Sequence, residues 1–357
     1  MANLVKCNMK HFLNKVSEMP IIAFGAGRKF RQFVSDFQLE NKIRFVVDND
    51  INIQGTEIEV NGISIQVENI QMLLKLPTSR YVILITSAYS IAQIMEQLNE
   101  YRELENVDCF SASLMQDNCN AETITYSTGK AIIPKVIHYF WFGKTPMNEK
   151  IRHCMNSWKK YCPDYKIIRW DESNYDVKKN QYMYEAYNAK KWGFVPDYAR
   201  LDIVGTYGGI YLDTDVEIIK SFDDLLCDSS FWGFANYNEV VTGIGFGSVA
   251  GNELALQMRD YYDTQKFIKE DGSMDLRPCC DYQDEVLKSY GFILNNKQQK
   301  INGNVLYPVE VFNPNGLVGI SDLYTENTHS IHWSTASWES KKNIRDLNEG
   351  KNKLRFM

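Results

Sequence analysis

The chain has 357 residues, of which 24% are charged and 44% are hydrophobic. This length and composition are typical of a soluble globular protein with two domains, each of which can bury its own core. The formal net charge of −6 argues against nucleic acid as the main partner, because nucleic-acid-binding surfaces need an excess of positive charge.

The eight cysteines follow neither a zinc-binding pattern nor a C-x-x-C spacing, and the adjacent pair Cys279-Cys280 is poorly suited to an ordinary disulfide. We therefore expect reduced thiols and a cytoplasmic protein. Residues 1–19 lack the apolar core and cleavage site of a signal peptide, and the longest apolar run, 81–92, is too short to span a bilayer. The expectation is a protein that is soluble or attached peripherally to the inner face of a membrane.

Residues 1–125 predict a small Rossmann-like α/β domain. Short runs of apolar and β-branched residues alternate there with segments in which apolar side chains recur at helical spacing. The predicted strands are 20–24, 43–47 and 81–86, and the predicted helices are 29–39 and 91–104.

A glycine-rich turn in this domain leaves two interpretations open. Gly25 and Gly27 follow the first predicted strand and Asp48 follows the second, where a dinucleotide-binding unit holds phosphate and ribose. Phe30 replaces the third glycine of that fingerprint, and its bulk hinders close packing at the phosphates. We therefore favour a structural or partner-binding role over a nucleotide site. The segment 111–130, rich in Ser, Thr and Asn, is the expected linker.

Residues 131–340 predict a second α/β domain, whose first core strand is 136–141. Trp141 at the end of this strand offers a flat ring for stacking on a nucleotide base, although a core aromatic is the simpler interpretation. The other early elements are predicted to be helices at 155–161 and 182–192, strands at 165–170, 231–234 and 244–247, and a glycine-rich approach to a ligand at 243, 245 and 247.

The middle of the chain carries the strongest pattern. A helix is predicted after Pro196, and a Gly-Gly pair at 208–209 ends it before a buried strand at 210–212. Asp213 and Asp215 follow directly. Two carboxylates one residue apart at the carboxyl end of a strand suit a hard divalent cation and a phosphate-bearing ligand, whereas the simpler alternative is a solvated acidic turn.

Two further charged residues favour a site over a solvated turn. Asp197 and Arg200 lie one helical turn apart on the preceding helix, so their side chains share a face. The Gly-Gly turn is expected to fold that face back toward Asp213 and Asp215. One cation and three acids then converge on one spot.

Taken together, these motifs resemble the DXD-containing sugar-transfer region of glycosyltransferase family 32. That family includes yeast-type α-1,6-mannosyltransferases and bacterial capsule and O-antigen enzymes, and its core is similar to that of large glucosylating bacterial toxins. The motifs are I-P-K-V-I-H-Y-F-W-F-G at 133–143, D-Y-A-R at 197–200, G-G-I-Y-L-D-T-D at 208–215, H-W at 332–333 and S-W at 337–338. Each is weak alone, but the set, in the family's order across about 132–340, is specific.

The resemblance implies a GT-A-type α/β fold and a metal-dependent, retaining glycosyltransferase (a hexosyltransferase). It implies a nucleotide-sugar donor, by analogy a UDP-sugar, and Mn²⁺ or Mg²⁺ as the cofactor. Asp215 is expected to bind the metal directly, and Asp213 to contact the ribose and, indirectly, the metal. Asp197 and Arg200 are expected to hold the donor sugar and the phosphate side.

Aromatic residues and one histidine complete the implied site. By resemblance Trp141 is the base platform, Phe140 contacts the base through its backbone, and Tyr211 lies against the nucleoside. Trp338 is expected to close over the diphosphate. His332 matches the place of a late histidine that completes the metal shell, and the open alternative is a structural histidine.

The acceptor side is less defined by the sequence. Tyr182, Tyr184 and Tyr187 suit a sugar groove, but ordinary helix packing is the preferred interpretation. The polar segment 271–287 is expected to be an acceptor-side loop, although it departs from the family's Gly-Pro pattern. The basic tail at 341–357 is expected to be a solvated helix, with a grip on anionic lipid as the alternative.

The expected acceptor is a carbohydrate, in particular a lipid-linked oligosaccharide of capsule or O-antigen synthesis. Three alternatives stay open at this point. The first is a sugar-nucleotide oxidoreductase acting through the amino-terminal domain, and the second is a transferase that modifies a protein side chain, as the toxins do. The third is a non-catalytic scaffold, which would not need the four charged residues Asp197, Arg200, Asp213 and Asp215.

Overall fold

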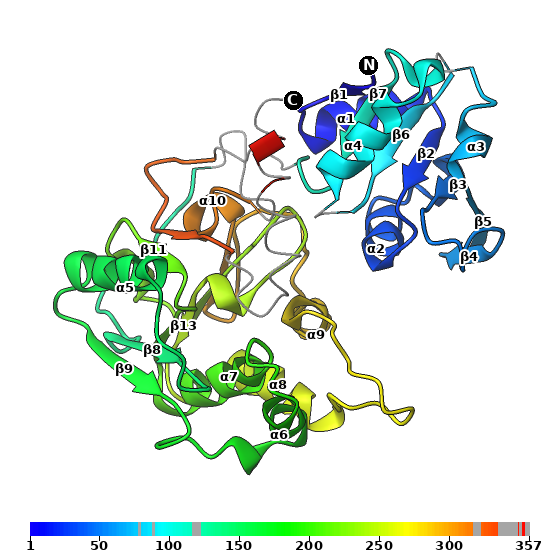
Figure 1. Cartoon of the computed structure of the whole chain (residues 1–357). Coiled ribbons are helices and arrows are strands. Elements are labelled where there is room, and N and C mark those ends of the chain that lie inside the picture. The colour runs from blue at the N-terminus through cyan, green and yellow to red at the C-terminus, as the bar shows by residue number, and fades with distance from the viewer. Residues whose placement is uncertain are drawn as a thin grey trace. The chain divides into compact units, whose positions relative to one another are not determined.

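The structure is a computed structural model, and it describes residues 1–77, 80–87, 90–115, 123–316, 323–334, 349 and 352–353. The chain folds into two compact units, the first built mainly from its amino-terminal third and the second mainly from the residues that follow (Figure 1). Both units combine helices with a seven-stranded sheet, which confirms the predicted α/β fold class.

The first unit is built on a largely parallel sheet. All of its strand pairs are parallel except the β4–β5 hairpin. Along the sheet the strands are β1 (Asn3–Leu4), β7 (Asp108–Ser111), β6 (Val82–Ile85), β2 (Ile21–Phe24), β3 (Ile43–Val47), β5 (Ile63–Glu68) and β4 (Glu57–Val60). The helices are α1 (Met9–Ser17), α2 (Arg28–Asp36), α3 (Ile70–Leu73) and α4 (Ile91–Asn99). This order is typical of a Rossmann-like domain.

The inner strands β2 and β6 are apolar and fully buried because helices cover both faces of the sheet there, whereas β5 and β4, toward one edge, alternate between buried and exposed residues. Phe12 of α1 packs against Phe110 of β7 and Phe33 of α2. On the other face, Ile91, Met95 and other buried residues of α4 join the core formed by alternate residues of β2 and β6. The predicted strands and helices of this unit are present, with the helix predicted for 91–104 ending at Asn99, whereas β1, α1, the β4–β5 hairpin, α3 and β7 were not foreseen.

The second unit is built on a mixed sheet. Its strands lie in the order β14 (Gln299–Ile301), β15 (Asn304–Tyr307), β12 (Ser230–Gly233), β13 (Phe246–Ser248), β10 (Gly209–Tyr211), β8 (Val136–Phe140) and β9 (Lys166–Trp170). The strand β10, inside the sheet, is parallel to β8 and antiparallel to the central strand β13. The elements that carry the predicted site are therefore neighbours in the middle of this sheet.

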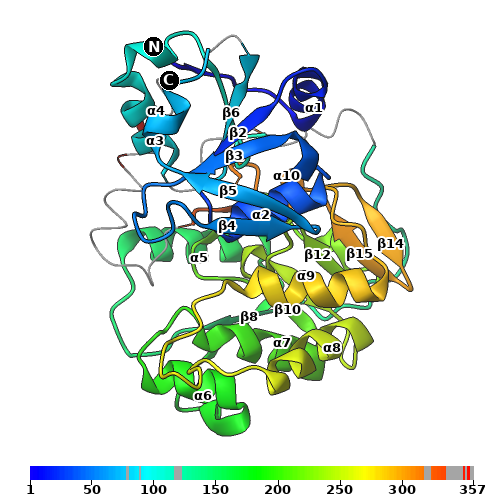
Figure 2. The ribbon, with the colours of Figure 1, turned by 90° about the vertical axis from the view of Figure 1, so that its right-hand side faces the viewer.

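Helices cover the two faces of this sheet. The first group lies side by side on one face: α6 (Gln181–Asn188), α7 (Val195–Tyr207), α8 (Glu253–Tyr261) and α9 (Cys279–Tyr290) (Figure 2). The other face packs on α5 (Glu149–Tyr161) and α10 (Val309–Phe312). Neighbouring strand residues alternate between the two cores, as in Tyr211 and Ile210, because successive side chains of a strand point to opposite faces.

A small second sheet lies beside the main one and carries the residues that follow the aspartates. It pairs β11 (Val216–Ile218) with β16 (Ser330–His332) in antiparallel register, with Val216 opposite His332. The helix α5 packs directly against β11. Residues about 115 positions apart in the sequence thus meet next to Asp215.

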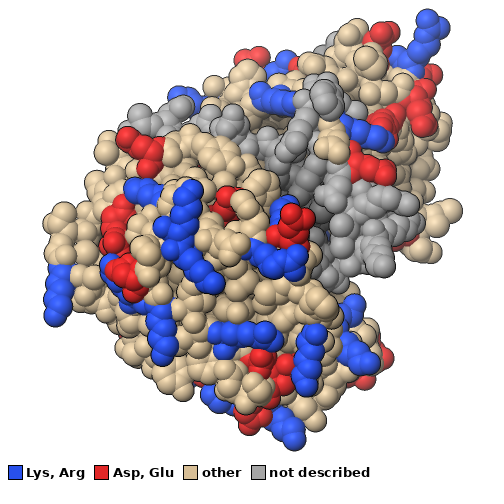
Figure 3. All heavy atoms as spheres, turned by 60° about the vertical axis from the view of Figure 1, so that its left-hand side comes forward, with Lys and Arg blue, Asp and Glu red and all other residues tan. Residues whose placement is uncertain are grey.

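The structure corrects the prediction for segment 271–287, and some other predicted residues lie outside the part of the chain that it describes. The segment 271–287 is not a loop throughout, because α9 begins at Cys279 and buries one face of its helix. Most of the basic tail lies outside the described residues, as does Trp338. None of the helices described is long and apolar enough to cross a membrane. On the face that Figure 3 presents, basic and acidic side chains are interspersed.

Candidate active site

The first turns of α7 place a buried ion pair at the site. Pro196 occupies the first turn, where its missing N–H costs no hydrogen bond. Asp197 and Arg200 are both almost completely buried and form an ion pair. The second guanidinium nitrogen of Arg200 lies 3.6 Å from Oδ1 of Asp213. The expected meeting of these charged side chains is therefore present in the geometry.

The Gly-Gly turn brings the chain back because only glycine fits there. Gly208 ends α7 with a φ of +70°, and a Cβ atom on Gly209 would lie 2.8 Å from the carbonyl oxygen of Val136. His138 of β8 fixes the turn: its Nε2 donates to the carbonyl oxygen of Gly208 at 3.0 Å, while its Nδ1 accepts from Trp170 at 3.1 Å. Burial lowers the pKa of His138 to about 4, so this imidazole is neutral at pH 7.

The two aspartates leave the end of β10 in fixed positions. The Asp213 backbone N–H donates to the carbonyl oxygen of Gly243, and the Tyr211 hydroxyl donates to Asp213 Oδ1 at 2.6 Å. Asp215 is met by His332, whose Nε2 lies 3.3 Å from Asp215 Oδ1. One ligand atom from each of Asp213, Asp215 and His332 lies within 4.8 Å of the other two.

These three side chains fit a divalent cation. Burial raises the pKa of Asp213, the neighbouring Asp215 adds to the effect, and Arg200 and His332 oppose it. Two carboxylates held this close repel each other, and a cation between them removes the repulsion. Carboxylate oxygens suit Mg²⁺ and Mn²⁺, and an imidazole nitrogen is also an acceptable ligand for transition metals such as Mn²⁺.

Gly243 belongs to the site, and its close contact with Asp213 was not predicted from the sequence. A Cβ atom at this position would overlap Asp213 Oδ2 and lie 3.1 Å from a guanidinium nitrogen of Arg200. The glycine-rich run from 243 to 247 was the available signal, and it was interpreted as an approach to a ligand. At Gly243 the close approach is to the protein's own carboxylate.

The loop that carries Gly243 is held by α9. Gln283 accepts from the Thr242 backbone N–H at 3.2 Å and donates to the Thr242 hydroxyl at 2.8 Å. Asp284 accepts from the Val240 backbone N–H at 3.2 Å. Both α9 side chains are buried, so through these hydrogen bonds α9 holds the loop that carries Gly243 in place.

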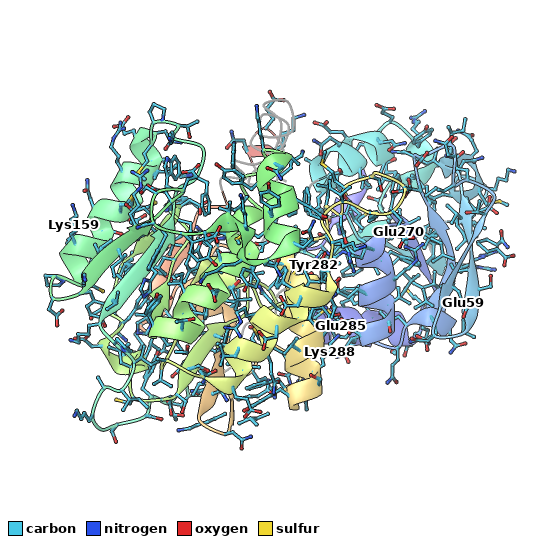
Figure 4. The ribbon with its side chains drawn as sticks, turned by 90° about the horizontal axis from the view of Figure 1, so that it is seen from below. Glu59, Lys159, Glu270, Tyr282, Glu285 and Lys288 are labelled. Atoms are coloured by element: carbon cyan, nitrogen blue, oxygen red, sulfur yellow. The ribbon has the colours of Figure 1, made fainter. Side chains whose placement is uncertain are left out.

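The opposite faces of α9 differ in character. Tyr282 lies on its buried face, with its ring 5.2 Å from that of Tyr262 and 6.0 Å from that of Tyr182, whereas Glu285 and Lys288 lie on its exposed face (Figure 4). Tyr182 is fully buried, which supports the helix-packing interpretation of this tyrosine.

Three aromatic residues predicted to contact the nucleotide differ in how deeply they are buried. The ring of Tyr211 is 1% exposed and packs beneath Asp213, so its position supports holding that carboxylate rather than lying against a nucleoside. Phe140 is buried, with its ring 5.3 Å from that of Phe142. Trp141 is half-buried and donates its indole N–H to the carbonyl oxygen of Thr145 at 2.7 Å. Its stacking on a base stays a prediction.

In the first unit, the carboxylate of Asp48 accepts hydrogen bonds from the glycine turn and from its own loop. Asp48 Oδ2 accepts from the Ala26 backbone N–H at 2.7 Å, and Oδ1 accepts from the Asp50 backbone N–H at 2.8 Å. Gly27 opens α2 and has no neighbouring atom within 4 Å of a Cβ position. This geometry agrees with the structural interpretation of the turn.

Comparison with known proteins places the second unit in a class. Residues 148–232 match the family described as a glycosyltransferase sugar-binding region containing a DXD motif. The match includes Asp197, Arg200, Asp213 and Asp215, and it excludes His332. Residues 148–232 are therefore similar to the sugar-binding region of DXD glycosyltransferases, and the predicted resemblance is confirmed.

Individual relatives agree with this class. Over 109 residues the chain is 37% identical to inositol phosphoceramide mannosyltransferase 3 of Schizosaccharomyces pombe, covering 28% of this chain and 29% of that enzyme. The chain thus spans less than a third of the length of that relative. It is 23% identical over 215 residues to an uncharacterized glycosyltransferase of Acanthamoeba polyphaga mimivirus, covering 57% of this chain and 84% of the viral protein.

Two solved structures are similar in part. The PaToxG glycosyltransferase is 14% identical, with 63% of this chain and 87% of that chain covered and a TM-score of 0.35. A glycosyltransferase involved in glycosylation of the major capsid of PBCV-1 is 13% identical, with 60% and 100% covered and a TM-score of 0.35.

Proposed function

We propose that this protein is a metal-dependent glycosyltransferase that moves a sugar from a nucleotide sugar to a carbohydrate acceptor. The observation that carries the proposal is the meeting of Asp213, Asp215 and His332 next to a buried Arg200, within a chain that is similar in part to DXD sugar-binding regions. A structural domain does not need two converging carboxylates at the end of an inner strand.

In this proposal Asp215 and His332 would hold a divalent cation, and Asp213 would contact the ribose and, indirectly, the metal. When bound there, Mn²⁺ or Mg²⁺ supplies positive charge next to the departing diphosphate. The Tyr211 hydroxyl and the Gly243 carbonyl group fix the orientation of Asp213. The aspartates are therefore already oriented before the donor binds, which lowers the reorganisation needed during reaction.

Arg200 and Asp197 position the donor. A guanidinium group can bind phosphate or hydroxyl oxygens through two parallel N–H groups, and the buried Asp197 keeps it in one orientation. We expect the configuration at the anomeric carbon to be retained. The acceptor hydroxyl attacks on the face from which the diphosphate departs, the bond to the diphosphate breaks, and the hydroxyl proton passes to the departing oxygen.

The substrates follow from the resemblance and from the site together. We propose a UDP-sugar donor and a lipid-linked oligosaccharide acceptor of capsule or O-antigen synthesis, with the protein in the cytoplasm or peripheral at the membrane. A mannosyltransferase named for inositol phosphoceramide among the relatives supports a carbohydrate that is carried on a lipid. An NMR spectrum of the product showing inverted anomeric configuration would contradict the retaining mechanism.

Nucleotide release tests the proposed function directly. UDP-, GDP- and CMP-activated sugars are incubated with the full chain in Mn²⁺ and in EDTA, with wild type and Asp215→Asn. We expect slow hydrolysis of one donor that requires the metal and falls at least about 100-fold in Asp215→Asn, as when one electrostatic stabiliser is removed. Equal hydrolysis in Asp215→Asn, with an unchanged circular dichroism spectrum, would contradict the assignment.

A further inference from the structure

The strand that follows the aspartates, β11, is held on both edges. On one edge it pairs with β16, and on the other edge side chains of α5 replace a neighbouring strand. The Trp158 indole N–H donates to the carbonyl oxygen of Val216 at 2.7 Å, and the Ser157 hydroxyl accepts from the Ile218 backbone N–H at 2.8 Å. Both α5 residues are buried, so this edge of β11 is rigid.

Strand β16 is supported at its start by α10: the His329 backbone N–H donates to the carbonyl oxygen of Val311 at 2.8 Å, and the Ser330 hydroxyl donates to that of Phe312 at 3.4 Å. These contacts lie two or more residues before His332. The strand has three residues, and β11 is its only partner strand among the residues that the structure describes. A two-stranded pairing this short is marginally stable by itself. Since β16 ends at His332, the reach of His332 to Asp215 depends on what fixes the end of this strand.

Glu217 links α5 to the end of β16. Its Oε1 lies 3.1 Å from Nε2 of His153 on α5, and its Oε2 accepts the Trp333 indole N–H at 3.0 Å. The Glu217 side chain is 19% exposed, whereas that of His153 is 67% exposed. The contact with Trp333 is therefore the better shielded of the two.

Trp333, the residue after His332, is held from three directions. Its backbone N–H donates to the carbonyl oxygen of Asp215 at 3.1 Å, its indole N–H donates to Glu217, and the Lys150 ammonium group lies 4.5 Å from its ring centre. A cation at this distance from an indole face is attracted to it. The side chain next to His332 is thus tied to both α5 and β11.

We propose that Glu217 is a positioning residue for the metal site: by holding Trp333 it fixes the end of β16 and keeps His332 within reach of Asp215. This inference rests on the metal site of the proposed function. Partners that orient metal ligands without touching the metal typically change metal affinity by about 10- to 100-fold when they are removed. Glu217 acts here through the residue next to the ligand.

The test measures Mn²⁺ binding to the full chain without any donor. Electron paramagnetic resonance detects the binding, because the signal of free Mn²⁺ decreases as the ion is bound. Glu217→Ala and Trp333→Phe each remove the hydrogen bond, and the second change keeps an aromatic ring. We expect the Kd for Mn²⁺ to rise about tenfold or more in each. The Kd of the double variant for Mn²⁺ should not exceed that of the single variant with the higher Kd, because both changes remove the same contact.

A matched control lies in the same part of the surface. Glu149, in the first turn of α5, lines the hollow that also contains Lys150, His153 and Trp333. Glu149→Ala removes the same charge without touching the Glu217–Trp333 hydrogen bond, so its Kd for Mn²⁺ should stay within about twofold of wild type. In donor hydrolysis, Glu217→Ala should raise the Mn²⁺ concentration for half-maximal rate and recover its kcat at saturating Mn²⁺.

The outcomes separate the two proposals. If wild type binds Mn²⁺ and both Glu217→Ala and Trp333→Phe bind it equally well, the inference is overturned and the proposed function stands. If wild type does not bind Mn²⁺, the metal site of the proposed function is wrong and the inference falls with it. If Glu217→Ala does not fold, Trp333→Phe decides, since it removes only the indole N–H donor from this contact.

Discussion

Both units place an acid just after a buried strand and near a glycine-rich turn, yet they use it in opposite ways. In the first unit, one carboxylate oxygen of Asp48 accepts the backbone N–H of Ala26 in the glycine turn, and the other accepts that of Asp50 in its own loop. In the second, Asp213 and Asp215 face each other, Arg200 and His332. The same short pattern thus gives a carboxylate bonded to backbone N–H groups in one place and a cluster of charged side chains in the other.

The difference lies in how the charge of each carboxylate is compensated. Two backbone N–H groups donate to the Asp48 carboxylate, so both of its oxygens already have hydrogen-bond partners within the protein. In the second unit, burial and the neighbouring Asp215 raise the pKa of Asp213, while Arg200 and His332 only partly oppose the rise. Such an arrangement costs stability unless a cation or a substrate completes it, which makes it the better candidate for chemistry.

Removing Arg200 should have the largest effect on stability. Its side chain is 4% exposed, and Arg200→Ala leaves the buried Asp197 carboxylate without its ion-pair partner. We expect the free energy of unfolding to fall by about 3–5 kcal/mol, as when one member of a buried pair is deleted. All seven tryptophans lie after residue 140, so tryptophan fluorescence in a urea titration follows the second unit alone.

An exposed pair in the first unit is the control for this prediction. Lys15 and Asp108 form a salt bridge at 2.9 Å with both side chains partly exposed, so Lys15→Ala should cost less than about 1 kcal/mol. Circular dichroism follows the unfolding of this variant. An Arg200→Ala variant as stable as wild type would show that the ion pair is not buried in solution.

Acid should weaken the second unit through His138. Its pKa is about 4 in the folded protein and 6.5 as the ordinary value, so the unfolded state binds more protons between these pH values. The stabilisation is complete above about pH 6.5 and is lost as the pH falls toward 4, by on the order of 3 kcal/mol. Urea titrations at pH 7.5, 6 and 5 should show this slope, and His138→Asn should flatten it.

A pair of glycine substitutions sharpens the comparison between the two turns. Gly243→Ala puts a methyl group against Asp213 and Arg200, and we expect a loss of about 1–3 kcal/mol and at least a tenfold drop in donor hydrolysis. Gly27→Ala meets no atom within 4 Å, so hydrolysis should equal that of wild type. Full hydrolysis by Gly243→Ala would mean that Asp213 can move without consequence.

The sequence predicted the elements whose patterns are strong and local. The helix after Pro196, the Gly-Gly break and the strand before Asp213 follow from backbone preferences of a few residues, and the structure confirms them. The meeting of Asp197, Arg200 and Asp213 was also foreseen, because a tight turn leaves little choice of geometry.

What the sequence did not show depends on contacts between distant residues. The polar composition of 271–287 suggested a loop, but Tyr282, Gln283 and Val286 are buried. Tyr282 packs on Tyr262, and Gln283 bonds to the loop around Thr242. Likewise, Tyr211 was expected to face a nucleoside, and its burial under Asp213 follows from strand pairing. Neither outcome is encoded in local periodicity, because both depend on which elements become neighbours.

The smallest expected effect tests the first unit itself. Asp48→Ala removes two hydrogen bonds from backbone N–H groups to one carboxylate, and we expect it to destabilise this unit by about 1 kcal/mol, seen by scanning calorimetry of the full chain. Donor hydrolysis and Mn²⁺ binding should stay at wild-type values, because this acid serves its own turn. If wild type instead shifts NADH fluorescence and Asp48→Ala abolishes that shift, Asp48 binds a dinucleotide ribose, and the contrast between the two turns fails.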